Sequence, residues 1–360
     1  MATINYTSGT TARPKGVALT HRTLWVHGMV IGLHLGVSAR DVYLHSLPMF
    51  HANGWGLPFV STGIGARQVV LRRVDGGEIL RRVEAEGVTL MCGAPAVVSA
   101  VLAAADAWTA EGRDLPGRGR VRVVVGGAAA PSAQIERVER DLGWEFIHAY
   151  GLTETAPAIT MNRVPPAWDA IDPAERARRE TKQGQPMLGV RLRINEEDGE
   201  LLARTNHVLE GYWDDPDATD RAIEDGWLHT GDAGTLEDGD MLVLTDRLKD
   251  VIVTGGENVS SIEVEDCLFS HPAIAEVAVI GVPDPRWGET VKALVVLRAG
   301  AEAGADEASI IAFARQRLAH FKCPTSVEIR GSLPRTATGK FQKYLLRESY
   351  WEETGRRIGG

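Results

Sequence analysis

Residues Tyr6 to Gly16, YTSGTTARPKG, combine the groups that bind a polyphosphate. Glycine lets the backbone approach a ligand closely, hydroxyls bond to oxyanions, and a lysine adds a positive charge. Pro14 precedes the lysine directly, which excludes the G-x-x-x-x-G-K loop of mononucleotide-binding proteins. A solvated turn rich in serine and threonine is the competing interpretation. The candidate phosphate-binding residues are Thr7, Ser8, Gly9, Thr10, Thr11 and Lys15.

Further along the chain, four stretches place reactive side chains on turns. AYGLTET, WLHTGD, DRLKD and LPRTATGK supply Tyr150, Thr153, Glu154, Asp232, Arg247, Lys249 and Lys340. A carboxylate among phosphates needs a cation, and Mg²⁺ prefers such oxygen ligands. Taken singly, each stretch is also explained as a helix cap, a turn aspartate or a solvated lysine.

In their order and spacing these stretches resemble the adenylate-forming superfamily, which includes acyl-CoA synthetases, luciferases and nonribosomal-peptide adenylation domains. The resemblance implies that Tyr150 stacks on adenine, Thr153 bonds to the α-phosphate and Glu154 holds Mg²⁺. It implies that Asp232 binds the ribose of ATP and that Arg247 contacts the ribose or a phosphate.

The resemblance also assigns the moving parts. Lys249 occupies the position of the domain hinge, and Lys340 is expected to bridge the carboxylate substrate and the α-phosphate. Two positions depart from the usual motifs: Ala12 replaces a glycine, and Lys343 replaces an arginine with the loss of a bidentate contact.

LPMFHANGW carries His51, which in acyl-CoA synthetases lines and gates the acyl site. Amino-acid adenylation domains place an aspartate there, so the expected substrate is a carboxylate without an α-amino group. SLPMFHANGW and GGEN look most like medium- to long-chain fatty acyl-CoA synthetases. The candidate nucleotide contacts also include Gly127 and Ala128, and the candidate CoA contacts are Gly255, Gly256, Arg286, Trp287 and Lys322.

The resemblance predicts an ATP- and Mg²⁺-dependent ligase that makes an acyl-adenylate and then transfers the acyl group to coenzyme A. The alternatives are an acyl-AMP ligase that loads a carrier protein, a luciferase-like monooxygenase, and an inactive remnant. Family members carry a large region before the first motif, so a truncated member is expected. Its partners are small molecules, and whether it forms a homodimer stays open.

The pattern of the chain predicts an α/β fold. Residues 78–86 read as a helix with Ile79, Leu80 and Val83 on one side, and the segments 88–92, 121–125 and 144–148 read as strands. Strand, helix and strand in this order imply a parallel sheet with its ligand crevice at the carboxyl ends of the strands. The loops GGAAAP and AYGLTET fall at those ends.

The expected organisation is a large layered α/β domain that lacks its N-terminal portion, followed by a mobile α+β domain. Residues 1–245 form the large domain, with an α/β part at 1–165 and a β subdomain at 186–245. Residues 246–250 form the hinge, 251–348 the C-terminal domain and 349–360 a tail. The charge run AERARRETKQ, between these parts, is expected to be a solvated helix or loop.

Composition limits the function classes. A net charge of -9 argues against a nucleic-acid surface, and no apolar run is long enough to span a membrane. The three cysteines are widely spaced, which favours a reducing, cytoplasmic location over a disulfide framework.

Overall fold

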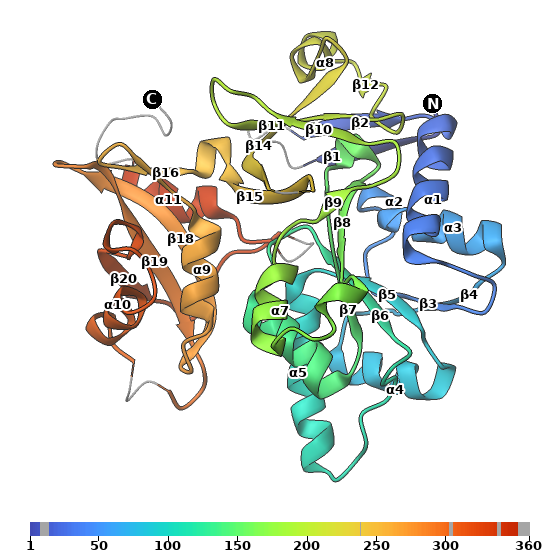
Figure 1. The fold of residues 1–360 in the computed structure, drawn as a ribbon, viewed down its shortest axis with the longest axis horizontal. Helices are drawn as coiled ribbons and strands as arrows, with labels where there is room; N and C mark the ends of the chain where they lie inside the picture. The colour runs from blue at the N-terminus through green and yellow to red at the C-terminus, as the bar shows by residue number, and fades with distance from the viewer. Residues whose placement is uncertain (8–13, 238, 302–304, 337–339, 352–360) are drawn as a thin grey trace. The chain divides into compact units, whose positions relative to one another are not determined.

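The computed structural model describes residues 1–7, 14–237, 239–301, 305–336 and 340–351 (Figure 1). The chain divides into two compact units. Unit 1 comprises Met1–Asn195, Leu201–Thr230 and Leu236–Val243, and unit 2 comprises Glu196–Glu200, Gly231–Thr235 and Leu244–Gly360. The predicted α/β class, with a larger and a smaller part, is confirmed.

The largest sheet belongs to unit 1 and has the strand order β4-β3-β5-β6-β7-β8-β9. Its strands are β3 (Val42–His45), β4 (Arg67–Val70), β5 (Leu90–Gly93), β6 (Arg122–Gly126), β7 (Glu145–Gly151), β8 (Ala158–Arg163) and β9 (Gln185–Pro186). The strands from β4 to β7 are parallel, because a helical crossover returns the chain between successive strands. The helices of unit 1 are α1 (His21–Leu35), α2 (Ala52–Trp55), α3 (Leu57–Ile64), α4 (Gly76–Glu86), α5 (Pro95–Ala110), α6 (Ser132–Arg137), α7 (Pro173–Glu180) and α8 (Pro216–Ala222).

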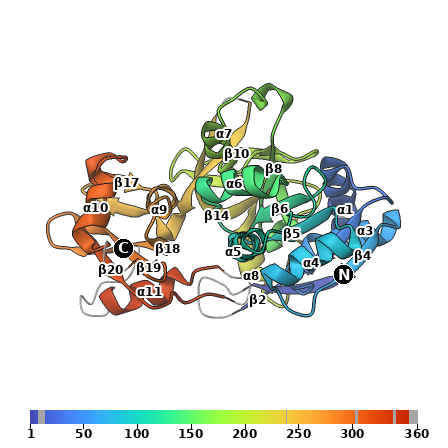
Figure 2. The same cartoon turned by 90° about the horizontal axis from the view of Figure 1, so that it is seen from below.

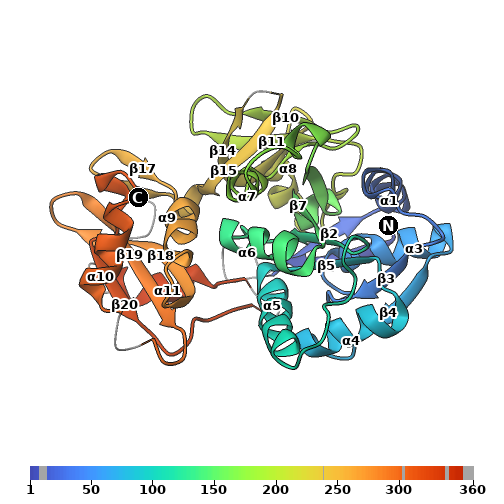
Figure 3. The same ribbon diagram turned by 60° about the horizontal axis from the view of Figure 1, so that its bottom comes forward.

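Both faces of this sheet are covered by helices (Figure 3). Val123 and Val125 of β6 pack into a core with apolar residues of α4 and α5. Val124, between them, faces the other side and packs into a core with residues of α1 and α3. This alternation explains the continuous run of valines, since a strand buried on both faces needs apolar residues at every position.

Two smaller sheets follow in the first part of the chain. An antiparallel sheet has the order β1-β2-β12 and consists of β1 (Thr3–Thr7), β2 (Lys15–Leu19) and β12 (Gly211–Tyr212). The other has the order β10-β11-β14-β13, with β15 beside β14. Its strands are β10 (Arg191–Ile194), β11 (Glu200–Arg204), β13 (Ile223–Glu224), β14 (Trp227–Glu237) and β15 (Met241–Arg247).

The sheet of unit 2 has the order β17-β16-β19-β18, with β20 beside β19. Figure 2 labels four of these strands, β17, β18, β19 and β20. Its strands are β16 (Ile252–Thr254), β17 (Glu257–Val259), β18 (Ile274–Asp284), β19 (Gly288–Leu297) and β20 (Ser326–Ile329). Helices α9 (Ser261–Phe269) and α10 (Glu307–Arg315) pack on one face, and α11 (Lys343–Trp351) packs on the other. Ser260 caps α9 as its spacing to Glu263 predicts, because its side chain accepts the Glu263 amide.

The charge run at AERARRETKQ forms the helix α7, one of the two conformations expected for it. It is not wholly solvated, because Ala177 and Glu180 are buried. Arg176 pairs with Glu139 at 2.6 Å, and this pair is mostly shielded from solvent. Ala177 and Glu180 are three positions apart, so they lie on the same side of the helix. The many charged residues around them make this helical spacing hard to recognise in the sequence.

Among the residues that the structure describes, no helix has the length and apolar character needed to cross a bilayer.

Candidate active site

The turn that carries Thr153 and Glu154 follows the carboxyl end of β7. Gly126 of β6 pairs in register with Ala149 of β7, so the loop with Gly127 and Ala128 leaves the same edge of the sheet as this turn. The turn needs Gly151, because a Cβ there would stand 1.9 Å from the Pro157 carbonyl oxygen.

A second segment, His207 to Tyr212, fastens this turn at three points. The His207 ring donates from Nδ1 to the Thr155 carbonyl at 2.8 Å, and the Leu209 amide donates to the Glu154 carbonyl at 2.7 Å. The third contact reaches the reactive group, since the Tyr212 hydroxyl donates to Oε1 of Glu154 at 2.8 Å. The carboxylate is therefore held in one orientation by a residue that sequence reasoning missed.

Tyr212 also contacts the phosphate-loop lysine. The Lys15 ammonium lies over its ring, 4.7 Å from the centroid. Burial raises the pKa of Tyr212, and the neighbouring Glu154 carboxylate raises it further, so the hydroxyl remains a donor. Thr7 ends β1 opposite Lys15 in the register of the β1–β2 pair. Ser8, Gly9, Thr10 and Thr11 lie outside the described residues.

His51 precedes an unusual turn. Five successive residues, Ala52 to Gly56, have positive φ, which costs about 1–2 kcal/mol for each residue with a side chain. Asn53 anchors the turn, because its Oδ1 accepts hydrogen bonds from Thr3 Oγ1 at 2.9 Å and Asn5 Nδ2 at 3.0 Å. The strand before the phosphate loop therefore fixes the segment that carries His51. Such strain is characteristic of functional sites.

A buried histidine pair lies behind the Glu154 turn. The His27 and His207 ring centroids are 5.4 Å apart. His27 accepts the Ala158 amide at Nε2, so its proton is on Nδ1, while His207 donates from Nδ1 and keeps a bare Nε2. The structure records no partner for His27 Nδ1 or His207 Nε2 in the residues that it describes. Burial lowers the pKa of both rings, which favours their neutral forms.

This pair predicts acid sensitivity. Burial, with a further contribution from His207, lowers the pKa of His27 to about 3, whereas the unfolded chain takes up the proton near pH 6.5. The contribution of His27 to the free energy of unfolding should be fully present above pH 6.5. Between pH 6.5 and 3 it should decrease by about 1.4 kcal/mol for each pH unit. Chemical denaturation at each pH measures it. A His27→Gln variant should have a shallower slope below pH 5, and an unchanged slope would contradict this assignment.

The predicted ribose-binding residues meet in unit 2. Asp232 is only 5% exposed, and its Oδ1 lies 3.2 Å from Nε of Arg247. Gly231, with φ of 72°, donates its amide to Glu200 Oε1 at 2.7 Å and so fixes the backbone of β14 next to Asp232, where the sequence predicted a turn. The ribose-binding role of Asp232 and Arg247 stays a prediction.

The predicted hinge residue is fastened by the last helix. Arg347, which is 5% exposed, donates to the Lys249 carbonyl at 3.0 Å and to the Asp250 carboxylate at 2.7 Å. Burial lowers the pKa of Lys249. Sequence reasoning missed Arg347, because nothing near it in the chain signals that contact.

Lys343, which replaces the arginine of the usual motif, is mostly shielded from solvent. Its ammonium lies 2.7 Å from Glu265 Oε1 and is hydrogen-bonded to Ser261 Oγ. Ser261 in turn donates to Asp246 at the end of β15. A compact ammonium fits this enclosed network.

Most of the candidate CoA residues cluster. The Gly255 amide donates to the Trp287 carbonyl at 3.0 Å, and the Arg286 guanidinium lies over the Trp287 ring. A Cβ at Gly255 would stand 2.8 Å from that ring, which explains the glycine. Gly256 follows directly with φ of 87°. Lys322 is instead engaged with Glu263, at 2.7 Å.

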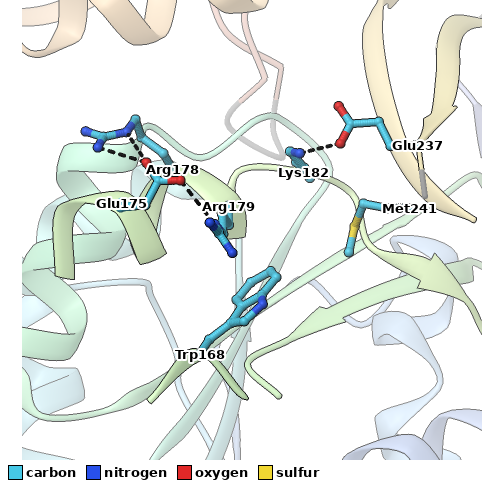
Figure 4. A pocket seen from close by; sticks show the side chains of 7 residues that line it. All are labelled: Trp168, Glu175, Arg178, Arg179, Lys182, Glu237 and Met241. Atoms are coloured by element: carbon cyan, nitrogen blue, oxygen red, sulfur yellow. Dashed lines mark hydrogen bonds and ion pairs between the residues drawn. The ribbon is translucent and has the colours of Figure 1, made fainter. Parts of the chain in front are cut away.

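Unit 1 also has a separate cavity of about 730 Å³, shown in Figure 4. It is lined by Trp168, Glu175, Arg178, Arg179, Lys182, Glu237 and Met241. Both arginines pair with Glu175, and Lys182 pairs with Glu237. The two arginines share one carboxylate, so the lining keeps a net charge of one positive unit, and none of the predicted site residues lines it.

The chain belongs to the AMP-binding enzyme family, whose model matches residues 1–213. Residues 263–340 match the AMP-binding enzyme C-terminal domain. These matches confirm the resemblance to adenylate-forming enzymes. They do not test the individual site residues.

Several named proteins are similar to this chain in sequence. It is 38% identical to 2-methylpropanoate–CoA ligase CCL4 of Humulus lupulus over 96% of its own length and 63% of that protein. It is 39% identical to 4-hydroxybutyrate–CoA ligase 2 of Metallosphaera sedula over 96% of its own length and 64% of that protein. The chain thus spans less than two thirds of the length of these relatives.

Solved structures of adenylate-forming enzymes are similar to this chain. ATP-bound MatB from Rhodopseudomonas palustris superimposes with a TM-score of 0.81 at 28% identity, covering 96% of this chain and 67% of that one. O-succinylbenzoate coenzyme A synthetase (MenE) from Bacillus subtilis, in complex with AMP, gives 0.80 at 28% identity, covering 96% and 68%.

Proposed function

We propose that the protein is an ATP-dependent acid–thiol ligase that activates a carboxylic acid as an acyl-adenylate and transfers the acyl group to coenzyme A. The observation that carries the proposal is the meeting of Lys15 and Glu154 at a single side chain, Tyr212, in a member of the AMP-binding enzyme family. An ammonium and a carboxylate so placed suit the phosphates of ATP and their metal ion.

Activation is needed because a carboxylate is a poor acyl donor. A carboxylate oxygen attacks the α-phosphorus of ATP and expels pyrophosphate. The acyl group is then bonded to AMP, which is a good leaving group. Lys15, Thr153 and Lys340 are assigned to the charge that develops at phosphorus, and Asp232 to the ribose hydroxyls. The CoA thiol then attacks the acyl carbon, and AMP departs; a thiol needs no dedicated base near neutral pH.

The residues present fit Mg²⁺. In the described part of the chain no group of three or more metal-ligating side chains is found. Mg²⁺ is commonly held by one or two carboxylates together with substrate phosphates, and Glu154 supplies such a carboxylate. When bound, the ion neutralises phosphate charge.

For the substrate, we propose an aliphatic carboxylic acid without an α-amino group. His51 stands where an amino-acid-activating enzyme would present an aspartate. The names of two relatives specify 2-methylpropanoate and 4-hydroxybutyrate, which are short acids. A medium- to long-chain fatty acid stays a prediction for this chain.

Residues 246–250 are retained as the proposed hinge.

Pyrophosphate release by the purified chain tests the proposal. The assay supplies ATP and Mg²⁺ with acids from 2-methylpropanoate to palmitate, with CoA, an amine or no acceptor. We expect acid-dependent release and an acyl-CoA product, and a loss of about a hundredfold in Glu154→Gln, because a neutral amide cannot hold the metal ion. Glu237→Gln, in the separate cavity, is the matched control.

Two outcomes would oppose the proposal. Release that is independent of any acid would contradict the ligase assignment. An amide product without a thioester would favour amide synthesis instead. The amide bond synthetase McbA from Marinactinospora thermotolerans has a similar structure, with a TM-score of 0.83.

A further inference from the structure

We propose that Tyr212 is a positioning residue for nucleotide activation: its hydroxyl aims the Glu154 carboxylate at the metal ion, and its ring keeps the Lys15 ammonium apart from that carboxylate. The inference rests on the proposed function and adds a residue to it.

The first step is the hydrogen bond. The Tyr212 hydroxyl engages Oε1 of Glu154 at 2.8 Å, and no described group bonds to Oε2. A carboxylate fixed through one oxygen presents the other in a defined direction, as the partners of metal-binding groups commonly do. The Leu209 amide, at 2.7 Å from the Glu154 carbonyl, fixes the backbone beneath it.

The second step is charge separation. Among the residues that the structure describes, no ion pair joins Lys15 to Glu154, although both contact Tyr212. A direct ion pair would neutralise both groups and compete with phosphate and metal ion. The ammonium instead rests against an aromatic face, which attracts cations weakly enough to release them to phosphate.

The third step is that Tyr212 is itself fixed. It pairs with Val17 in the β12–β2 ladder, two residues beyond Lys15. Its amide donates to Thr219 Oγ1 at 2.9 Å, and its ring packs against an apolar cluster that includes Leu209. A rigid support of this kind is what a preorganised site requires.

The test compares wild type with Tyr212→Phe, which lacks only the hydroxyl oxygen, and with Tyr344→Phe, an exposed matched control. Calorimetry measures ATP binding at a series of Mg²⁺ concentrations and in EDTA. We expect Tyr212→Phe to require about tenfold more Mg²⁺ for the same ATP affinity, with binding in EDTA unchanged. A merely structural role would weaken both equally, and that result would overturn the inference.

A double-mutant cycle keeps the test decisive if Tyr212→Phe is less stable. In the Glu154→Gln background the Tyr212→Phe change should not alter the Mg²⁺ requirement further, because the hydroxyl acts through that carboxylate. Additive effects would overturn the inference while leaving the ligase proposal intact. Failure of wild type to bind ATP with Mg²⁺ would overturn the proposed function as well.

Discussion

Replacing Lys340 with alanine is expected to lower the rate of adenylate formation by about a thousandfold, because the loss of one charged donor at a developing oxyanion costs a factor of that order. Transfer from a supplied acyl-adenylate to CoA should persist near the wild-type rate, since no phosphoryl charge develops in that step. Single-turnover assays of each half-reaction measure both effects. Lys182→Ala, in the separate cavity, is the control.

The structure supports a defined place for this lysine. The Lys340 amide donates to Thr336 Oγ1 at 3.2 Å, and the Thr336 amide donates to the Lys340 carbonyl at 2.8 Å. Arg335 and Phe341 pair next to these two residues as an antiparallel bridge. Equal loss of both half-reactions in Lys340→Ala would contradict the division of labour and point to a folding defect.

The second large effect is expected in stability. Lys343→Met should lower the free energy of unfolding of unit 2 by about 3–5 kcal/mol, because removal of one partner leaves a buried charge uncompensated. Glu265 is that charge: its side chain is mostly shielded from solvent, its burial raises its pKa, and Lys343 opposes this rise. The Val279 amide, at 2.8 Å, is its other recorded donor. Denaturant unfolding followed by circular dichroism measures the loss.

A double variant separates charge from packing. Lys343→Met combined with Glu265→Leu should recover most of the stability, since replacing both partners by apolar groups of similar volume is often close to neutral. If Lys343→Met left stability unchanged but abolished activity, Lys343 would be a ligand contact, as its place after the terminal motif first indicated.

Much of the fold could be predicted because its signals are local. A helix at 78–86 was expected from Ile79, Leu80 and Val83; the observed helix α4 begins two residues earlier, buries all three side chains and ends at Gly87. The strands around Val121 to Val125 and Trp144 to His148 were expected from β-branched and apolar runs, and both lie in the parallel sheet. The burial of one side of α7 was not expected, because its buried residues Ala177 and Glu180 stand among many charged residues in the sequence.

The sequence by itself determined the family, since the order and spacing of motifs survive without any knowledge of contacts. It also placed Tyr150, Thr153, Glu154, Asp232 and Lys340 as candidates, because each stands inside a recognisable stretch. Only the tertiary structure decided what supports them. Tyr212 and Glu154 are 58 positions apart, Lys343 and Ser261 82, and Arg347 and Lys249 98. A hydrogen bond depends on distance in space, and periodicity along the chain carries no record of a partner so remote.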